Sequence, residues 1–477
     1  MENKIFIYNS LSRKKEELIP LKPQEIKMYV CGPTVYDQPH IGHARSAYIF
    51  DVIRRYLIYR GYKVKFVRNV TDVDDKIIDK AQKEFKGEDL NEAVKKVSVK
   101  YLDLYHEDMK SLGILEPSVE PKATEYVDKD KPLMQEFIGR LIKNDCAYVS
   151  EGDVYFDIKK ARDYGKLSNQ AIDKMEAGSR IAPGEKKKDP LDFALWKAAK
   201  VGEPSWDSPW GKGRPGWHIE CSVMSSDILG DEFDIHGGGL DLIFPHHENE
   251  IAQSEGAGKK FARYWIHHGL LTINGQKMSK SLGNFITVKD FLKKYKNADL
   301  LKMLFLSTHH SHPVDYTDEK IQEAKQALDR ISILWGKIGG PIDKKFTGKT
   351  PEELEDVKKK FISAMDDNFN TPQGLAAIFE LVSITNKKLD NQEFVSASRD
   401  ILLELTQLFG LSVSPSVNVD AFSLKLDLPD VEILIQARNE ARKNKDFNKS
   451  DEIRKELEAK GIILEDTKEG TAWRRKL

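Results

Sequence analysis

Cysteine is scarce in this sequence: only three occur among its 477 residues. So few cysteines exclude a disulfide-stapled scaffold and favour a reducing compartment, so we expect a cytoplasmic protein. The N-terminus lacks the basic segment and apolar run of a signal peptide, and no stretch approaches the roughly 18 apolar residues of a membrane span. With 31 glycines and 19 prolines, the composition also excludes collagen-like and low-complexity chains. We therefore expect no membrane partner.

An excess of charge of one sign is also lacking. The 75 Lys and Arg residues nearly balance 76 Asp and Glu residues, which gives a formal net charge of −1. This balance gives no support for a nucleic-acid partner, although a local basic face would be sufficient to bind one. What is present is an ordinary globular composition, 40% hydrophobic and 32% charged, in a chain long enough for several domains.

The first part of the chain has the pattern of a strand, a helix and a second strand. The apolar segment Ile26–Cys31 predicts a strand, and apolar residues recur at helical spacing from Ile41 until Gly61 stops them. Val64–Val70 predicts the next strand. A β-α-β opening favours an α/β fold with a parallel sheet.

Composition and periodicity divide the whole chain into six parts. Residues 1–122 and 210–314 have α/β character, and the less regular 123–209 between them predicts a connective insertion. Residues 315–410 show the spacing of a helical bundle, and 411–430 resemble a linker in composition. Residues 431–477 open with a charged pair of helices and end on a basic segment.

The tetrapeptide His40-Ile41-Gly42-His43, here called the HIGH segment, stands where a loop enters the first helix. The free N–H groups of a helix N-terminus favour an anion, and Gly42 allows a ligand to approach the backbone closely. The two histidines face the same side and can donate hydrogen bonds to phosphate oxygens. A pair of surface or capping histidines explains the tetrapeptide equally well.

The KMSKS segment, Lys277–Ser281, follows an Asn-Gly turn signal. Two lysines and two serines on a short loop suit a pyrophosphate that develops charge as it leaves, although a solvated basic loop is the plainer explanation. The two segments occur in this order and about 235 residues apart. Together they resemble the signatures of class I aminoacyl-tRNA synthetases, which implies a Rossmann-type catalytic domain formed by 1–122 and 210–314.

The resemblance implies that ATP binds between these two segments. His40 and His43 would act on the ATP phosphates, and Lys277 and Lys280 on the β- and γ-phosphates in the transition state. We expect Mg²⁺ to accompany the ATP. The predicted ATP-binding residues are His40, Gly42, His43, Lys277, Ser279 and Lys280.

Four scattered residues suggest a metal site. Cys31 ends the first strand, Cys221 lies far along the chain, and His246 and Glu250 share one face of a helix that begins after Pro245. Two thiolates, one imidazole and one carboxylate make a reasonable zinc set, and their wide spacing excludes a zinc finger. Taken singly, a buried cysteine is usually a small hydrophobic residue, and a helical histidine is usually a polar surface group.

The segments around these residues resemble the cysteinyl-tRNA synthetase family over nearly the whole chain. The match rests on CGPTVYD, GWHIECS, FDIHGGG and FPHHENE, and on residues 69–76, 364–372 and 461–475. In that family the zinc ligands fall on the positions of Cys31, Cys221, His246 and Glu250, with one zinc per chain bound to the substrate thiolate. Because zinc prefers sulfur to a neutral hydroxyl, it can reject serine without an editing domain.

The resemblance implies three substrates: L-cysteine, ATP and tRNA(Cys). Cysteine would be activated to cysteinyl-adenylate and then transferred to the terminal adenosine of the tRNA. The predicted wall of the amino-acid pocket comprises Gly32, Thr34, Thr71, Trp217 and His236. The third cysteine, Cys146, is predicted to be a buried structural thiol.

In that family the C-terminal module reads the anticodon, and unpaired bases are read by stacking and by hydrogen bonds to their edges. The matching positions are Arg442, Phe447, Asp451, Asp466 and Trp473, although each could be a helix-surface or strand residue. Family members often carry Trp where Phe447 stands, so stacking is retained but a ring N–H is lost. Lys302 replaces a common Arg, which weakens any planar bidentate contact there.

Three alternatives remain open on the sequence alone. A related ligase that transfers cysteine to an amino sugar would lack the 431–477 module. A zinc hydrolase would need an H-E-x-x-H pattern, which is absent, and an open metal position for water. A non-catalytic tRNA-binding relative would not need intact HIGH and KMSKS segments. We expect a monomer, because no dimerisation segment is evident.

Overall fold

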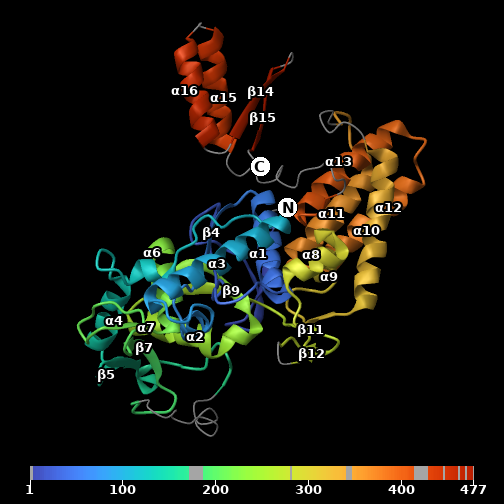
Figure 1. Ribbon diagram of the computed structural model, residues 1–477. Coiled ribbons are helices and arrows are strands. Elements are labelled where there is room, and N and C mark those ends of the chain that lie inside the picture. The colour runs from blue at the N-terminus through green and yellow to red at the C-terminus, as the bar shows by residue number, and fades with distance from the viewer. Residues whose placement is uncertain are drawn as a thin grey trace. The chain divides into compact units, whose positions relative to one another are not determined.

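A computed structural model describes residues 4–170, 186–279, 282–339, 346–412, 428–443, 446–459, 462–467 and 470–475. The chain divides into two compact units, Met1–Ser414 and Pro415–Leu477, and each is described by itself (Figure 1). None of the described helices is long and apolar enough to cross a membrane.

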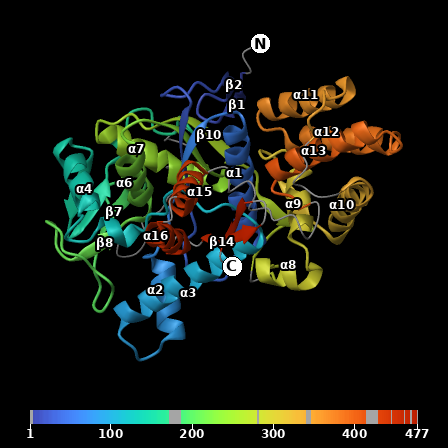
Figure 2. The ribbon, with the colours of Figure 1, turned by 90° about the horizontal axis from the view of Figure 1, so that it is seen from above.

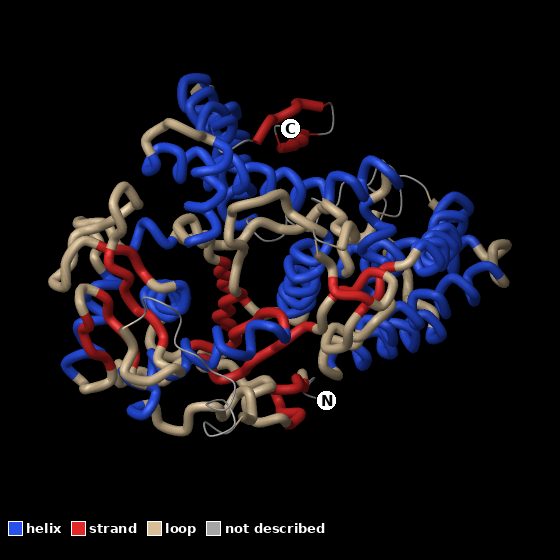
Figure 3. The backbone as a smooth tube through the Cα atoms, turned by 60° about the horizontal axis from the view of Figure 1, so that its bottom comes forward, coloured by secondary structure: helices blue, strands red, loops and turns tan. Residues whose placement is uncertain are grey.

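A parallel four-stranded sheet forms the centre of the first unit. Its order is β10-β9-β3-β4, and all neighbouring pairs are parallel. The strands appear as adjacent red segments in Figure 3. Their bounds are β3 Glu25–Val30, β4 Lys63–Arg68, β9 Phe233–Gly239 and β10 Ala262–His268. The α/β prediction with a parallel sheet is confirmed.

Helix α1 (Ile41–Tyr59) connects β3 to β4 and confirms the predicted β-α-β opening. It ends just before Gly61, whose positive φ of 89° suits glycine. Strand β4 ends at Arg68, two residues earlier than expected, because the amide of Val70 donates to the carbonyl of Pro121 instead of continuing the sheet. Helix α1 runs between the insertion elements on one side and the helical bundle on the other (Figures 1 and 2).

The region predicted as an irregular insertion is more ordered than expected. Its strands β5, β6 and β7 form an antiparallel sheet of order β5-β6-β7-β8 with β8, which lies just beyond the predicted boundary at 209. Phe156 and Trp196 from this sheet share one hydrophobic cluster with Tyr29 and Val67 of the central sheet. Most of the expected Ala182–Pro190 loop lies outside the described residues. The elements are η1 Ala123–Tyr126, α4 Leu133–Lys143, β5 Ala147–Ser150, β6 Asp153–Phe156, η2 Ile158–Lys160, β7 Phe193–Ala198 and β8 Gly213–Pro215.

The remaining elements before the helical bundle are a hairpin, a small second sheet and several helices. β1 and β2 form an N-terminal hairpin, and β11 pairs with both β12 and β13 in a separate three-stranded sheet. The bounds are β1 Phe6–Asn9, β2 Lys14–Glu17, α2 Asp75–Glu84, α3 Leu90–Ser111, α6 Trp217–Leu229, η3 Leu240–Leu242, η4 Ile243–His247, α7 Glu248–Gly256, β11 Leu271–Ile273, β12 Gln276–Lys277, α8 Val288–Tyr295, α9 Ala298–Leu306 and β13 Val314–Tyr316.

Four helices follow, as the spacing over 315–410 predicts. They are α10 Asp318–Ile338, α11 Glu352–Asp366, α12 Thr371–Asn386 and α13 Gln392–Leu408. Helix α1 is bonded to this bundle: Tyr48 donates its hydroxyl to the carbonyl of Phe409, and Tyr56 donates to Asp366. The bundle is therefore tied to the helix that begins with the HIGH segment.

The described residues of the second unit form two helices and a hairpin. They are α15 Leu428–Lys443, α16 Phe447–Ala459, β14 Ile462–Thr467 and β15 Gly470–Arg475. Ile453, Leu457 and Leu464 form its small core. The helix pair agrees with the sequence pattern. The six domain boundaries stay predictions, and most of the expected linker, 413–427, lies outside the described residues.

Candidate active site and metal centre

The HIGH segment forms a hydrogen-bonded cap on α1. His40 is the N-cap residue, and its Nδ1 accepts hydrogen bonds from the amides of Gly42 (3.1 Å) and His43 (3.3 Å). In return, Nδ1 of His43 accepts from the amide of His40 at 3.3 Å. Both Nδ1 atoms are acceptors, so each neutral ring carries its proton on Nε2, the atom that can donate to a phosphate.

The two rings stack with centroids 3.7 Å apart. Burial, together with the neighbouring His40, lowers the pKa of His43 to about 3. His43 therefore offers a neutral N–H donor rather than a cation. A Cβ on Gly42 would lie 2.9 Å from the His40 ring, so glycine is needed for the cap itself and not only for a ligand.

The KMSKS segment begins on the hairpin β11–β12. Asn274 and Gly275 both have positive φ, as a two-residue hairpin turn requires, and Lys277 pairs with Thr272. Asn284 secures the segment, since its side chain accepts from the Ser279 amide (2.8 Å) and donates to the Lys277 carbonyl (3.2 Å). Lys280 and Ser281 lie outside the described residues.

The backbone brings the two segments together. The amide of Ile41 donates to the carbonyl of Ile286 (3.1 Å), and the amide of Val288 donates to the carbonyl of Pro39 (3.2 Å). His40 also packs edge-on against Phe285, with centroids 5.3 Å apart. The chain that follows the KMSKS segment is therefore paired with the loop that enters α1. The assigned roles of these residues stay predictions.

The four predicted metal ligands converge in one buried cluster. The sulfurs of Cys31 and Cys221 are 3.8 Å apart, Cys31 Sγ is 3.7 Å from Glu250 Oε1, and His246 Nε2 is 3.0 Å from the same oxygen. Two sulfurs bound to one zinc ion at about 2.3 Å in tetrahedral geometry would also be roughly 3.8 Å apart. The donor set and its spacing therefore fit a metal ion, and two thiolates favour zinc.

Charge within the cluster is balanced by neighbouring side chains. Burial favours a neutral Glu250, but His236 and His246 outweigh it and hold the pKa of Glu250 at about 2. Burial likewise opposes a charged His246, but Glu250 and Cys221 outweigh it and raise the pKa of His246 to about 10. A bound dication would take the place of the His246 proton in offsetting these negative groups.

A second set of donors shares Cys31 and Glu250 with the first, and comprises Cys31, His236, His247 and Glu250. His236 Nε2 lies 2.7 Å from Glu250 Oε2, and His247 Nε2 lies 3.3 Å from Cys31 Sγ. His236 and His247 thus contact Glu250 and Cys31, which are two ligands of the first set. Because the first set contains two sulfurs, it is the better zinc site, and His236 and His247 are placed to orient its ligands.

His247 extends the cluster toward the N-terminal hairpin. Its Nδ1 lies 2.8 Å from His267 Nε2, and His267 Nδ1 lies 2.8 Å from the hydroxyl of Ser10. The sequence analysis assigned no role to these residues. The adjacent histidines of FPHHENE were the available signal, because His247 is three residues before Glu250 and shares its side of the helix.

The predicted pocket residues surround the cluster but differ in exposure. Trp217 is 38% exposed and stacks on His246, with centroids 4.1 Å apart. His236 is completely buried, and Thr71 donates its hydroxyl to Glu220 at 2.6 Å. Trp217 is therefore open to a ligand, whereas His236 and Thr71 face protein groups.

Gly32 and Thr34 lie on the loop between β3 and α1. The Gly32 amide donates to Asn69 Oδ1 at 2.8 Å, and a Cβ on Gly32 would lie only 1.6 Å from the Asn69 carbonyl. Thr34 forms a bridge with Thr71. Asn69, whose Oδ1 also lies 3.7 Å from Cys221 Sγ, was missed by the sequence analysis. It joins the loop to the metal cluster.

Lys302 is buried rather than exposed to a partner. It is 3% exposed and donates to Asp299 Oδ1 (2.9 Å) and to the Gly410 carbonyl (2.7 Å). Asp299 Oδ2 accepts the Ser412 amide at 2.8 Å. Lys302 therefore connects α9 to the chain after α13 through single hydrogen bonds.

Cys146 is half-buried and donates to the Asn144 carbonyl at 3.5 Å, apart from the metal cluster.

In the second unit, Phe447 begins α16 and is 62% exposed, as a stacking residue requires. Arg442 and Asp451 lie on α15 and α16 and are also exposed. Asp466 lies on β14 and Trp473 on β15.

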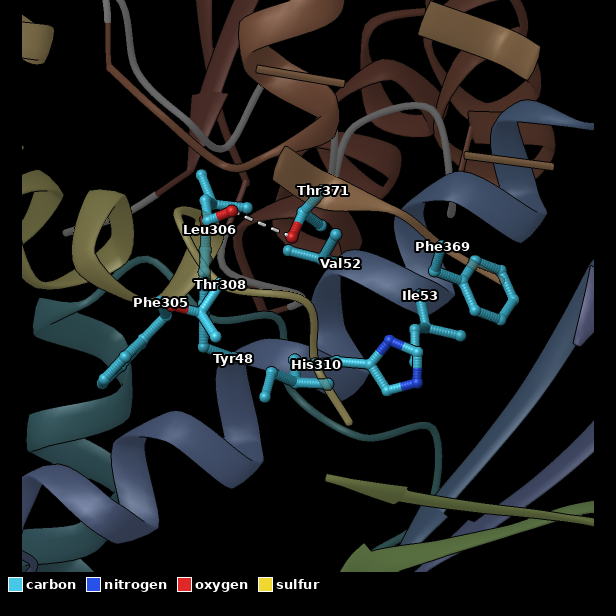
Figure 4. A pocket seen from close by; sticks show the side chains of 10 residues that line it. Tyr48, Val52, Ile53, Phe305, Leu306, Thr308, His310, Phe369 and Thr371 are labelled. Carbon is cyan, nitrogen blue, oxygen red and sulfur yellow. Dashed lines mark hydrogen bonds between the residues drawn. The ribbon is translucent and has the colours of Figure 1, made fainter. Parts of the chain in front are cut away.

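A pocket at the junction of α1, α9 and the bundle is mostly apolar (Figure 4). Tyr48, Phe305 and Phe369 line it, and Thr371 donates its hydroxyl to the Leu306 carbonyl at 3.1 Å. None of its lining residues belongs to the predicted active site or metal centre. We interpret it as a packing gap where the bundle meets α1.

Comparisons with known proteins place this geometry in a family. A family model for the class I (C) tRNA synthetase catalytic domain matches residues 17–326, a DALR domain matches 360–414, and a cysteinyl-tRNA ligase anticodon-binding domain matches 428–474. The cysteine–tRNA ligase of Anoxybacillus flavithermus is 47% identical over 481 residues and covers 99% of each chain. That of Persephonella marina is 48% identical over 504 residues and covers 98% of this chain and 99% of the relative.

Solved structures agree on the fold. A putative arginyl-tRNA synthetase from Campylobacter jejuni is 15% identical, with a TM-score of 0.56 over 83% of this chain and 95% of its own. Methionyl-tRNA synthetase of Mycobacterium tuberculosis in complex with methionyl-adenylate is also 15% identical, with a TM-score of 0.55 over 81% and 90%. The chain belongs to the cysteine–tRNA ligase family of class I aminoacyl-tRNA synthetases.

Proposed function

We propose that this protein activates L-cysteine with ATP and attaches it to tRNA(Cys), and that a zinc ion selects the substrate thiol. The observation that carries the proposal is the convergence of Cys31, Cys221, His246 and Glu250 at the end of β3, the strand that precedes the HIGH segment. The match of residues 428–474 to an anticodon-binding domain disfavours a ligase that acts on an amino sugar. The fold likeness to synthetases likewise disfavours a zinc hydrolase.

Cys31, Cys221, His246 and Glu250 would hold the zinc ion, with His236 and His247 orienting them. When bound, the zinc ion supplies a Lewis acid that binds a thiolate far better than a neutral hydroxyl. Trp217 stacks on His246 and is 38% exposed, so it would form one wall of the cysteine pocket. Discrimination between cysteine and serine then depends on sulfur rather than on shape.

In the first step the cysteine carboxylate attacks the α-phosphorus of ATP. A carboxyl–phosphate bond forms, and the bond from the α-phosphorus to the bridging oxygen breaks, so that pyrophosphate leaves. His40 and His43 would donate their Nε2 protons as hydrogen bonds to phosphate oxygens. Lys277 and Lys280 would offset the charge that develops on pyrophosphate, and Mg²⁺ would accompany ATP.

In the second step a hydroxyl of the terminal adenosine of tRNA(Cys) attacks the cysteinyl carbonyl, and AMP leaves. Arg442, Phe447, Asp451, Asp466 and Trp473 would contact the anticodon. We further propose that the protein works as a monomer in the cytoplasm, which light scattering of the purified protein would test in part.

The deciding experiment is ATP–pyrophosphate exchange by purified protein without tRNA. Cysteine, serine and alanine are compared, before and after the metal is removed by a chelator and after zinc is restored. We expect exchange with cysteine only, lost on chelation and recovered with zinc. Absence of exchange by metal-replete protein with cysteine would contradict the activation step, and exchange that survives metal loss would contradict the selective role of zinc.

The tRNA step is tested by aminoacylation with a tRNA(Cys) transcript. Replacing Phe447→Ala should raise the KM for tRNA by about tenfold, because loss of one stacked base costs roughly 1–3 kcal/mol. Pyrophosphate exchange should not change. Phe447→Trp, which keeps a stacking face, serves as the matched control and should restore the KM.

A further inference from the structure

Arg45 is a buried charge that the proposed chemistry does not use. It lies on the second turn of α1 and is 1% exposed. Its Nη1 donates to the carbonyls of Gly269 and Leu270, both at 2.5 Å. Its Nη2 donates to the carbonyls of His312 (2.5 Å) and His310 (3.4 Å). The guanidinium therefore joins α1 to two segments that are far apart in the sequence.

Both segments lead directly into the sheet that carries Lys277. Residues 269–270 connect β10 to β11, and residues 310–312 lead from α9 toward β13. β11 pairs with β13 on one side and with β12, which ends at Lys277, on the other. The carbonyls that Arg45 binds thus lie at the base of the hairpin from which the KMSKS segment extends.

The two segments also touch each other closely. The Gly269 amide donates to the His310 carbonyl at 2.8 Å, and the Val314 amide donates to the Leu270 carbonyl at 3.0 Å. A Cβ on Gly269 would lie 2.2 Å from the backbone of His312, so only glycine fits there. Arg45 closes this junction from the side of α1.

An arginine at this buried position indicates a role in holding backbone segments together. Burial lowers the pKa of Arg45 to about 10, so the group is still charged at neutral pH. Removing a charge from water is costly, and a simple packing contact would be made at lower cost by an apolar side chain. The planar fork of arginine directs several N–H groups in fixed directions and so holds two segments at once, which a lysine ammonium cannot do in the same geometry.

We propose that Arg45 is a positioning residue for cysteine activation. It fixes the base of hairpin β11–β12 against α1, the helix that begins with His40 and His43. Lys277 would then be held at a fixed position relative to phosphates bound at the HIGH segment. The kinetic part of this inference rests on the proposed function, whereas the anchoring of the hairpin does not.

The test compares Arg45→Lys with Arg54→Lys. Arg54 is a matched control, because it is also buried on α1 but its Nη1 donates to the carbonyl of Glu116 at 2.5 Å, outside the hairpin. For Arg45→Lys we expect kcat of pyrophosphate exchange to fall about 100-fold, since a misplacement of about 1 Å can cost that much. The KM for cysteine should stay within about threefold, and bound zinc should not change.

Amide hydrogen exchange of the free protein supplies a readout that needs no activity. Arg45→Lys should increase exchange at residues 271–277, whereas Arg54→Lys should leave these amides protected. Unchanged protection in Arg45→Lys would overturn the proposal even if the wild-type protein proves inactive with cysteine. Equal losses of kcat in both variants, or a parallel loss of kcat, cysteine binding and zinc in Arg45→Lys, would also overturn it.

Discussion

Cys221, His246 and Glu250 are at most 2% exposed, whereas Lys277 lies exposed on a strand of two residues. The metal cluster is held by contacts from several elements, including β3, α6, β9 and α7. The described part of the KMSKS segment, by contrast, follows one hairpin, and the side chain of Asn284 bonds the Ser279 amide and the Lys277 carbonyl. A metal ion that binds the substrate directly needs ligands in fixed positions, and the burial of the metal cluster would provide these. A lysine that contacts a leaving pyrophosphate must be exposed, and the hairpin β11–β12 would hold Lys277 in such a place.

The largest effect should come from removing a ligand from the cluster. Cys221→Ala takes away one of two sulfurs, so we expect bound zinc to fall from about one per chain to near zero and exchange with cysteine to fall more than about 1,000-fold. Metal analysis and pyrophosphate exchange measure the two effects. Cys146→Ala is the matched control and should retain both zinc and activity. Retention of zinc by Cys221→Ala would show that the second donor set holds the metal.

A change on the exposed side should affect rate alone. Lys277→Ala removes a cation that we propose offsets the charge developing on pyrophosphate, so kcat of exchange should fall about 100-fold. The KM for cysteine and the zinc content should be unchanged. Gln276→Ala, on the same strand, is the control and should be nearly as active as the wild type. If Lys277→Ala weakened cysteine binding as much as it lowered kcat, the lysine would not act on the transition state.

An intermediate effect should come from a group that orients a ligand. His236→Asn removes the contact with Glu250 Oε2, so zinc affinity should fall by roughly 10- to 100-fold. Competition with a chromogenic chelator measures this affinity. His106→Asn, on the exposed surface of α3, is the control. Unaltered zinc affinity in His236→Asn would mean that Glu250 needs no partner to keep its orientation.

The smallest effect should come from the tether of the KMSKS segment. Asn284→Ala removes two neutral hydrogen bonds on a partly exposed loop, where each is worth about 0.5 kcal/mol, so kcat of exchange should fall about fivefold. Zinc affinity and the KM for cysteine should not change. Asn274→Gly, which keeps the positive φ of the neighbouring turn, is the control. A loss as large as that of Lys277→Ala would show that the segment is positioned mainly by Asn284.

Local patterns were sufficient for much of the fold. The strand predicted at Ile26–Cys31, which the structure has at Glu25–Val30, the helix from Ile41 and the stop at Gly61 follow from hydrophobic periodicity and from glycine alone. The antiparallel sheet of the insertion was not foreseen, because its strands are only three to six residues long and β8 contains Gly213 and Pro215, which give no strand signal.

Some residues of the candidate site were predicted and others were not, because local sequence patterns do not report contacts between distant residues. The residues of the first donor set were found because they stand in segments that resemble a known family. Asn69, His267 and Asn284 were missed, because each acts through a contact with a residue distant in sequence or through a loop whose path no periodicity describes. His236 was found, but its burial behind Glu250 becomes evident only once β9 and α7 are packed together.

The cap of α1 has a consequence for how its motif evolves. His40 and His43 each use Nδ1 to close the first turn, and in the proposed reaction each would also donate from Nε2 to a phosphate, so each residue would have two roles. An asparagine at position 40 could still cap the helix but would lose the imidazole N–H. A lineage that lost the catalytic function would therefore still be selected to keep capping residues here. Traces of the HIGH segment could thus outlast the activity they once served.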